Sequence, residues 1–145
     1  MVVGDFKGKI LFLDTSPLIY FIEGDTAYQR LLLNLFSSID EGDFSFITST
    51  VTLLEVLVKP LKDNRQDIVN QYTDILTSAK GIDIFDINIA VSKEAAKLRA
   101  KYSLRTPDAI QLSTAIIFGA DFFLTNDIRL KLVSEVKVLV LSEID

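Results

Sequence analysis

The chain has 145 residues, of which 49% are hydrophobic, and this is the size of one domain with a substantial buried core. It contains no His, Cys or Trp, which excludes disulfides, Ser-His-Asp triads and the usual zinc sites, so carboxylates, hydroxyls, Lys or Arg must carry any catalysis. A net charge of −5 at pH 7 argues against a passive nucleic-acid binder with a broad basic surface.

No apolar run approaches the roughly 20 residues that a membrane-spanning helix needs. The N-terminal residues also lack the charged and apolar regions of a signal peptide. We therefore expect a soluble cytoplasmic protein that forms a single domain over residues 1–145.

The first half of the chain is predicted to contain two strands and four helices. Pro17 is typical of a first helical position, Ser49 and Thr50 can cap a following helix, and Lys59-Pro60 is expected to close that helix. The predicted strands are 10–13 and 44–48, and the predicted helices are 18–23, 28–39, 51–58 and 64–79.

The second half alternates in the same way. Thr106 is predicted to cap a helix with Pro107 at its first position, and Gly119 to end it. The predicted strands are 81–87, 121–124 and 137–141, the predicted helices are 88–102 and 106–118, and a helical turn is expected at 128–132.

Apolar strands that alternate with helices indicate a parallel sheet covered on both faces. The sequence therefore predicts an α/β protein, a three-layer α/β/α sandwich with a central parallel sheet of about five strands. Such sheets bind ligands beyond the C-terminal ends of their strands, so we look for a functional site there.

Two acids follow predicted strands directly: Asp14 after the first, and Asp127 after residues 122–126. Either one could simply cap a turn. Asp108 falls in the first turn of its helix, where the helix dipole stabilises an acid with or without a catalytic role.

Glu55 lies on the same helix face as Val51, Leu54 and Val58, so it interrupts an apolar stripe. A carboxylate buried there would demand a cation or a hydrogen-bond network. The alternative is a Glu at the edge of the stripe that reaches water or pairs with Lys59.

A doubly wound fold can bring these four acids to one edge of the sheet. Two unit charges about 4 Å apart repel by about 4 kcal/mol at an effective dielectric of 20, so such a cluster needs cations. Oxygen ligands without imidazole or thiolate favour Mg²⁺ or Mn²⁺. Divalent cations can promote phosphodiester hydrolysis without histidine, which predicts a nuclease.

The chain resembles the PIN-domain family and, in size, the VapC-type toxin ribonucleases. The matching segments occur in the family's order and span essentially the whole chain. They are Phe12-Leu-Asp14-Thr-Ser, Thr50-Val-Thr-Leu-Leu-Glu55, Thr106-Pro-Asp108-Ala-Ile-Gln-Leu-Ser-Thr-Ala115 and Ala120-Asp-Phe-Phe-Leu-Thr125-Asn-Asp127.

The resemblance implies endonuclease action on single-stranded RNA, with Mg²⁺ or Mn²⁺ held by the catalytic acids Asp14, Glu55, Asp108 and Asp127. It places the hydroxyls of Ser16 and Thr125 beside the metal site. It also implies a homodimer and, for a toxin, a small antitoxin protein that blocks the cleft. One departure is that some relatives carry a further acid just after the position of Asp127, where this chain has Ile128 and Arg129.

Basic residues precede Asp108 along one short segment, and we expect some of them to bind RNA phosphates beside the metal. The segment contains Lys93, Lys97, Arg99, Lys101 and Arg105, of which Lys97, Lys101 and Arg105 are the candidates for RNA binding. A solvated helix face explains the same charges without RNA.

Two other functions fit the predicted fold. A Mg²⁺-dependent phosphatase of the haloacid-dehalogenase type also has an Asp after its first strand, but it needs a second Asp two residues later, where this chain has Ser16. In the other alternative, the protein is a non-catalytic RNA-binding or assembly module whose acids merely cap helices.

Overall fold

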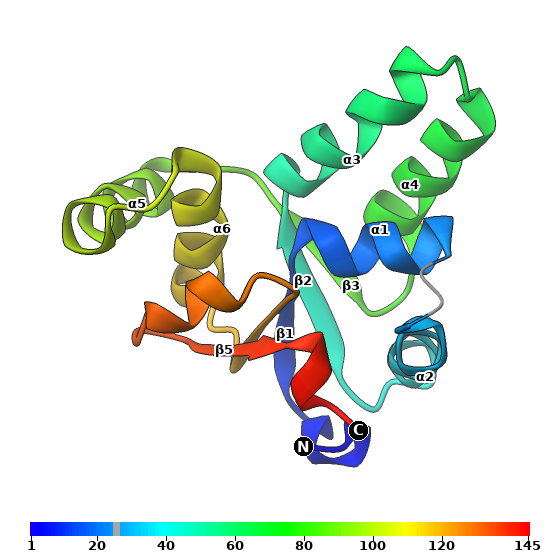
Figure 1. Cartoon of the computed structure of the whole chain (residues 1–145), viewed down its shortest axis with the longest axis horizontal. Coiled ribbons are helices and arrows are strands. Elements are labelled where there is room, and N and C mark those ends of the chain that lie inside the picture. The colour runs from blue at the N-terminus through cyan, green and yellow to red at the C-terminus, as the bar shows by residue number, and fades with distance from the viewer. Residues whose placement is uncertain (25–26) are drawn as a thin grey trace.

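The computed structural model describes residues 1–24 and 27–145 and contains a five-stranded parallel sheet with the order β3-β2-β1-β4-β5 (Figure 1). Leu13 of β1 aligns with Leu124 of β4, so the C-terminal ends of the two central strands lie side by side. The strands are β1 (Ile10–Leu13), β2 (Ser45–Ser49), β3 (Ile82–Phe85), β4 (Phe122–Thr125) and β5 (Lys137–Val140). This confirms the predicted parallel α/β fold.

Helices cover both faces of the sheet because its strands are apolar on both sides. In β1, Leu11 and Leu13 pack on one face, and Phe12 packs on the other. The first face is covered by α1 (Thr15–Glu23), α2 (Gln29–Asp40), α3 (Thr50–Lys62) and α4 (Gln66–Ser78), and the second by α5 (Ile89–Tyr102) and α6 (Thr106–Ile117). Short 3₁₀ helices occupy Val3–Phe6, Ile128–Leu132 and Leu141–Glu143.

Two predicted helix ends and one predicted N-cap were wrong near prolines. α1 begins at Thr15, before Pro17, because the Asp14 side chain caps it. α3 continues through Pro60 to Lys62, although the prediction closed the helix there. Pro60 is buried, so apolar packing compensates for the missing backbone hydrogen bond. At α6, the N-cap is Arg105 and not Thr106, one residue earlier than predicted.

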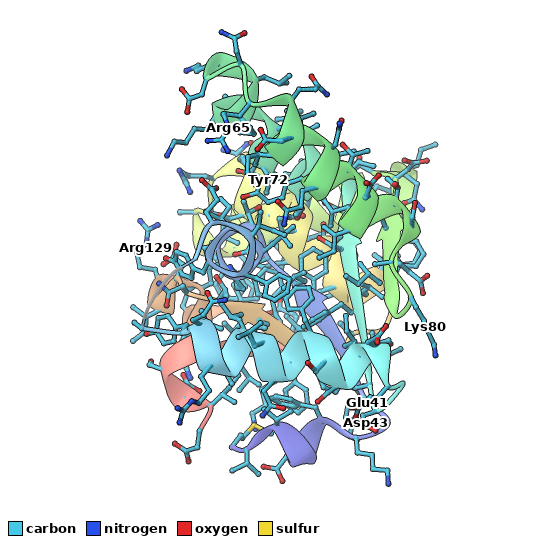
Figure 2. All side chains as sticks on the ribbon, turned by 90° about the vertical axis from the view of Figure 1, so that its right-hand side faces the viewer. Glu41, Asp43, Arg65, Tyr72, Lys80 and Arg129 are labelled. Atoms are coloured by element: carbon cyan, nitrogen blue, oxygen red, sulfur yellow. The ribbon has the colours of Figure 1, made fainter. Side chains whose placement is uncertain are left out.

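The α3–α4 pair projects from the sheet, and Figure 2 shows Arg65 near its outer end. The hydroxyl of Tyr72 in α4 donates a 2.7 Å hydrogen bond to Glu23 Oε2 at the end of α1, which ties this pair to the first helix. Within residues 1–24 and 27–145, no helix combines the length and apolar character needed to cross a bilayer.

Candidate functional site

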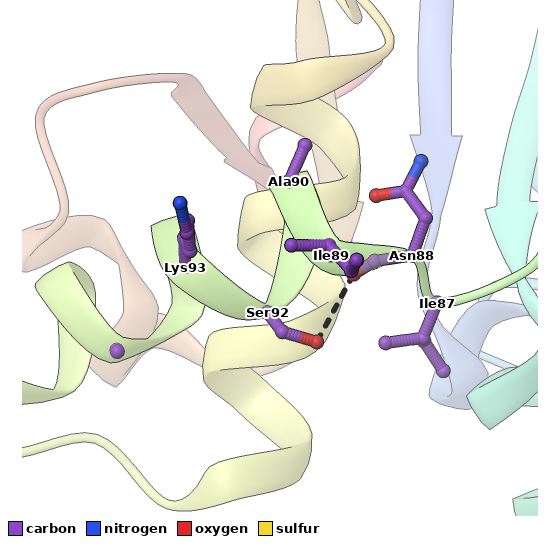
Figure 3. Close-up of a pocket in the computed structure, with 7 residues that line it drawn as sticks. Ile87, Asn88, Ile89, Ala90, Ser92 and Lys93 are labelled. Atoms are coloured by element: carbon purple, nitrogen blue, oxygen red, sulfur yellow. Dashed lines mark hydrogen bonds between the residues drawn. The ribbon is translucent and has the colours of Figure 1, made fainter.

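A hollow of about 800 Å³ lies at the start of α5 (Figure 3). Its wall contains the cation Lys93 but no carboxylate, and a 3.0 Å hydrogen bond joins the Ser92 hydroxyl to the carbonyl of Asn88. The predicted acids therefore do not line this hollow.

Asp14 sits where β1 passes into α1, at the C-terminal edge of the sheet. Its Oδ1 accepts a 2.9 Å hydrogen bond from the backbone N–H of Thr15, and its Oδ2 accepts a 2.7 Å hydrogen bond from the hydroxyl of Thr125. The pKa of Asp14 is raised to about 6, chiefly by burial and to a smaller extent by the charges of Asp108 and Glu55, while the hydrogen bonds from Thr125 and Thr15 oppose the shift. Its carboxylate thus lies in a site that disfavours negative charge.

Glu55 lies on the exposed part of α3, which corrects the expectation of a buried carboxylate in an apolar stripe. The helix instead buries the side of Thr52 and Val56. The hydroxyl of Thr15 donates a 2.8 Å hydrogen bond to Glu55 Oε1. In the part of the chain that the structure describes, no ion pair joins Glu55 to Lys59.

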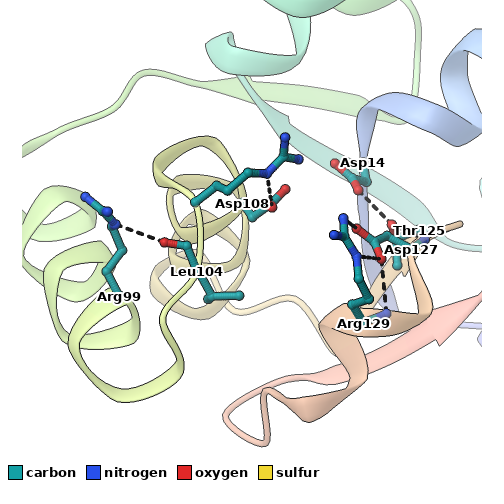
Figure 4. A network of polar contacts seen from close by, with 8 residues as sticks. Asp14, Arg99, Leu104, Asp108, Thr125, Asp127 and Arg129 are labelled. Carbon is teal, nitrogen blue, oxygen red and sulfur yellow. Dashed lines mark hydrogen bonds and ion pairs between the residues drawn. The ribbon is translucent and has the colours of Figure 1, made fainter.

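Asp108 and Asp127 are each paired with an arginine, as Figure 4 shows. Arg105 Nε lies 3.2 Å from Asp108 Oδ2. Arg129 binds Asp127 with both ends of its fork, from Nε to Oδ1 at 3.0 Å and from Nη2 to Oδ2 at 2.7 Å. This pairing lowers the pKa of Asp127.

The four predicted acids come from four segments that meet at one edge of the sheet. Asp14 and Asp127 are connected through Thr125, whose hydroxyl also accepts a 3.1 Å hydrogen bond from the backbone N–H of Asp127. Glu55 and Asp108 lie close enough to Asp14 for their charges to raise its pKa. Neither acid lies on the far side of the sheet from Asp14. A nuclease site requires this proximity.

A divalent cation fits this site in the kind of donor that it offers. All four side chains supply carboxylate oxygens, the ligands that Mg²⁺ and Mn²⁺ prefer, and Asp14 lies where negative charge is unfavourable without a cation. In their present positions, however, the described residues include no group of three or more Asp, Glu, His or Cys arranged to hold a metal ion. Guanidinium groups instead neutralise two of the four acids.

Two hydroxyl residues were also predicted beside the metal site. Thr125 is fully buried and donates to Asp14, whereas Ser16 lies partly buried in the first turn of α1. Thr15 was not among the predicted site residues, although its position next to Asp14 was a signal: its N–H binds Asp14 and its hydroxyl binds Glu55.

The basic residues proposed for RNA binding differ in their surroundings. Lys97 lies 3.9 Å from Glu94 within α5, and Lys101 lies 3.4 Å from Glu135. Of the three candidates, Arg105 is the one paired with a site acid.

A buried polar network behind the acids was also missed. Gln111 Nε2 donates a 2.6 Å hydrogen bond to Thr52 Oγ1, and Gln111 Oε1 accepts one from the hydroxyl of Ser49. Gln111 lies one turn after Asp108 in α6, and Thr52 lies one turn before Glu55 in α3. The network therefore sets the position of one acid-bearing helix relative to the other.

The model of the PIN domain matches residues 11–136, so the chain belongs to the PIN-domain family. The match includes all four predicted acids. No curated protein matches the chain.

Solved toxin structures share the fold over nearly their whole length. VapBC2 from Rickettsia felis, described as bound to a DNA fragment from its promoter, matches with a TM-score of 0.73 and 19% identity over 90% of this chain and 98% of that one. A toxin–antitoxin complex from Klebsiella pneumoniae matches with a TM-score of 0.66 and 22% identity over 91% of this chain and 97% of that one. VapC20 from Mycobacterium tuberculosis is described as a toxin that cleaves the sarcin-ricin loop. It matches with a TM-score of 0.67 and 15% identity over 88% of this chain and 98% of that one.

Proposed function

We propose that the protein is a Mg²⁺- or Mn²⁺-dependent endoribonuclease that hydrolyses single-stranded RNA, and that it acts in the cytoplasm as the toxin of a toxin–antitoxin pair. The observation that carries this proposal is that the acids meet at one edge of the sheet: Thr15 hydrogen-bonds both Asp14 and Glu55, and Thr125 hydrogen-bonds Asp14 and the backbone of Asp127. Burial, together with the charges of Asp108 and Glu55, also raises the pKa of Asp14. A cation at this position would remove the cost of ionising the buried carboxylate.

Asp14, Glu55, Asp108 and Asp127 would hold the cation. When bound, it would supply positive charge that stabilises the charge developing on the phosphate during hydrolysis. Thr15 and Thr125 orient Asp14 through hydrogen bonds of 2.9 and 2.7 Å, so this ligand is positioned before a cation arrives. Ser16, close to Asp14 in sequence, would line the same site.

Single-stranded RNA is proposed as the substrate on two grounds. The family resemblance points to RNA, and the similar VapC20 is described as cleaving the sarcin-ricin loop. In addition, Arg105 places a largely exposed guanidinium beside Asp108, where a phosphate would have to lie. Lys97 and Lys101 would extend this contact along α5.

A small antitoxin is the proposed protein partner, since the similar structures include toxin–antitoxin complexes. A groove of about 270 Å³ between α1 and α3 contains Glu55 in its wall. A peptide in this groove would reach the acids and block access of RNA. Ile19, Tyr20 and Val56 would supply its apolar contacts.

A homodimer is proposed from the same resemblance. Exposed apolar side chains support it: Leu54 and Val58 lie one turn apart on α3, and Ile89 at the start of α5 is 77% exposed. We expect size-exclusion chromatography with light scattering to show a dimer for the unchanged chain. Ile89→Lys should shift it toward monomer if this end of α5 lies in the interface.

Two alternative functions remain outcomes of the test. Ser16 occupies the position where the phosphatase needs its second Asp, and the family match also favours the nuclease. Trapping an aspartyl phosphate on Asp14 would support the phosphatase. A non-catalytic module would bind RNA without cutting it.

The decisive experiment follows cleavage of a labelled single-stranded RNA with Mn²⁺. Asp14→Asn and Asp108→Asn should each abolish cutting, whereas Asp74→Asn, at an exposed position of α4, should cut normally. Equal residual cutting by all the proteins would indicate a contaminating nuclease and reject the proposal.

A further inference from the structure

Arg129 binds the carboxylate of Asp127, which is one of the four acids proposed to hold the metal ion. Its Nε and Nη2 bind the two carboxylate oxygens at 3.0 and 2.7 Å, and its backbone N–H adds a third contact, to Oδ1, at 3.0 Å. A bidentate guanidinium uses both oxygens of a carboxylate, which leaves little of Asp127 for another cation.

The surroundings make this pair part of a larger charge cluster. The charge of Asp108 acts on Arg129, and the charge of Arg105 acts on Asp127. Two carboxylates and two guanidinium groups thus alternate at the edge of the sheet (Figure 4). In this arrangement, arginines provide the positive charge that the acids require.

The Arg129 end of this ion pair is open to solvent. The Arg129 side chain is 72% exposed, whereas Asp127 is 27% exposed, so the pair lies on the surface at the arginine end. Exposed ion pairs contribute little net free energy, so a divalent cation can compete with such a pair. Arginine also binds phosphate oxygens with the same bidentate fork.

We propose that Arg129 is an exchangeable counter-ion: it neutralises Asp127 in the metal-free protein, and it transfers to a phosphate of the RNA strand when a divalent cation takes the carboxylate. This inference rests on the proposed nuclease function and names a residue that would couple metal binding to substrate binding. Arg129 acts as a positioning residue, because it alternates between Asp127, a proposed metal ligand, and a phosphate of the RNA.

The chain contains a matched control for this pair. Arg65 binds Asp67, also two residues away, from Nε to Oδ1 at 3.0 Å and from Nη2 to Oδ2 at 2.8 Å. This second pair lies at the start of α4, and Figure 2 shows Arg65 and Arg129 at separate places on the molecule. Arg65→Gln therefore removes the same kind of ion pair away from the acids.

The first measurement is Mn²⁺ affinity without RNA, by electron paramagnetic resonance of the free ion. Because Arg129→Gln removes the competing cation, it should tighten Mn²⁺ binding by about two- to fivefold, as expected for one exposed bidentate pair. Arg129→Lys keeps the charge but loses the bidentate contact, so its Mn²⁺ affinity should lie between those of the unchanged protein and Arg129→Gln. Arg65→Gln should leave the affinity unchanged.

The second measurement follows the arginine side chains directly. In ¹⁵N NMR spectra, Mg²⁺ should shift the Nε–H signal of Arg129 and leave that of Arg65 in place. RNA binding in Ca²⁺ should weaken in Arg129→Gln, and the slope of log affinity against log salt should fall by about 0.7, the value for one phosphate contact on a single strand.

The two proposals fail in different ways. If the unchanged protein binds Mn²⁺ and cuts RNA, but Arg129→Gln has the same Mn²⁺ affinity as Arg65→Gln, only the exchange of Arg129 is rejected. If the unchanged protein neither binds Mn²⁺ nor cuts RNA, the nuclease proposal is rejected together with it. A normal melting temperature for Arg129→Gln shows that the variant is folded.

Discussion

Gln111 and Thr52 join the two helices that carry Asp108 and Glu55, through a buried 2.6 Å hydrogen bond from Gln111 Nε2 to Thr52 Oγ1. Both side chains lie one helical turn from the acid on their own helix, and Gln111 also binds the Ser49 hydroxyl at the end of β2. The bond thus links the core of the protein to the spacing of its acids.

We first expect Gln111→Met, which keeps the shape but removes the hydrogen bonds, to lower the free energy of unfolding by about 2–3 kcal/mol, because Ser49 and Thr52 lose buried partners. It should also weaken Mn²⁺ binding, because the two helices are no longer tied. The matched control is Thr114→Val, which removes a partly buried hydrogen bond within α6 itself. Denaturant unfolding and Mn²⁺ titration measure both effects, and equal metal affinity in the two variants would contradict a positioning role.

The second prediction concerns pH and Asp14 in the absence of divalent cations. The folded-state pKa of about 6 lies above the ordinary value of 3.8, because burial disfavours the charge. The folded protein therefore holds this proton more tightly than the unfolded chain, and the unfolding free energy falls as pH rises from about 4 to about 6, then stays at the lower value. Two pKa units correspond to at most about 3 kcal/mol.

Asp14→Asn removes this titration and retains a side chain that can cap α1. Its stability relative to the unchanged protein should therefore increase by about 1–3 kcal/mol between pH 4 and pH 7. Urea unfolding in EDTA across this interval measures the difference. A difference that does not vary with pH would show that Asp14 titrates normally.

The third prediction concerns the hydroxyl of Thr125, which lowers the pKa of Asp14 by donating a hydrogen bond to it. Thr125→Val should raise that pKa above about 6 and weaken Mn²⁺ binding, since the carboxylate is then ionised less readily. Thr125→Ser retains the hydroxyl and should restore both properties. Carbon-13 NMR titration of the Asp14 carboxyl group in EDTA provides the measurement, and the same pKa in all three proteins would refute the prediction.

The fourth prediction tests the turn before β3. Gly81 has φ +83°, and a Cβ there would lie 2.8 Å from the carbonyl oxygen of Ile39. Gly81→Ala should lower stability by about 2 kcal/mol or more, because it adds a backbone clash to the strain of the left-handed conformation. Gly119→Ala is the control: its φ is +76°, but among the described residues no atom beyond its chain neighbours lies within 4 Å of the added carbon, so we expect a loss of about 1 kcal/mol. Thermal unfolding of both variants decides whether the clash adds to the strain.

The positions of Asp14 and Asp127 at the ends of adjacent strands could be predicted from the sequence. Short apolar runs identify buried parallel strands, and their C-terminal ends must meet at one edge of the sheet. Helix ends were less predictable. Pro60 continues α3 because its packing compensates for the missing hydrogen bond, and a local pattern does not contain that packing.

The local sequence determined where the apolar strands, the helices and the acids beside them lie along the chain, because strand burial and helix periodicity depend on neighbouring residues. Tertiary structure alone decided that Glu55 is exposed, that Gln111 joins α6 to α3, and that Arg129 forms an ion pair with Asp127. Which side of a helix is buried depends on what packs against it, and which cation neutralises an acid depends on the side chains that the fold brings within hydrogen-bond distance.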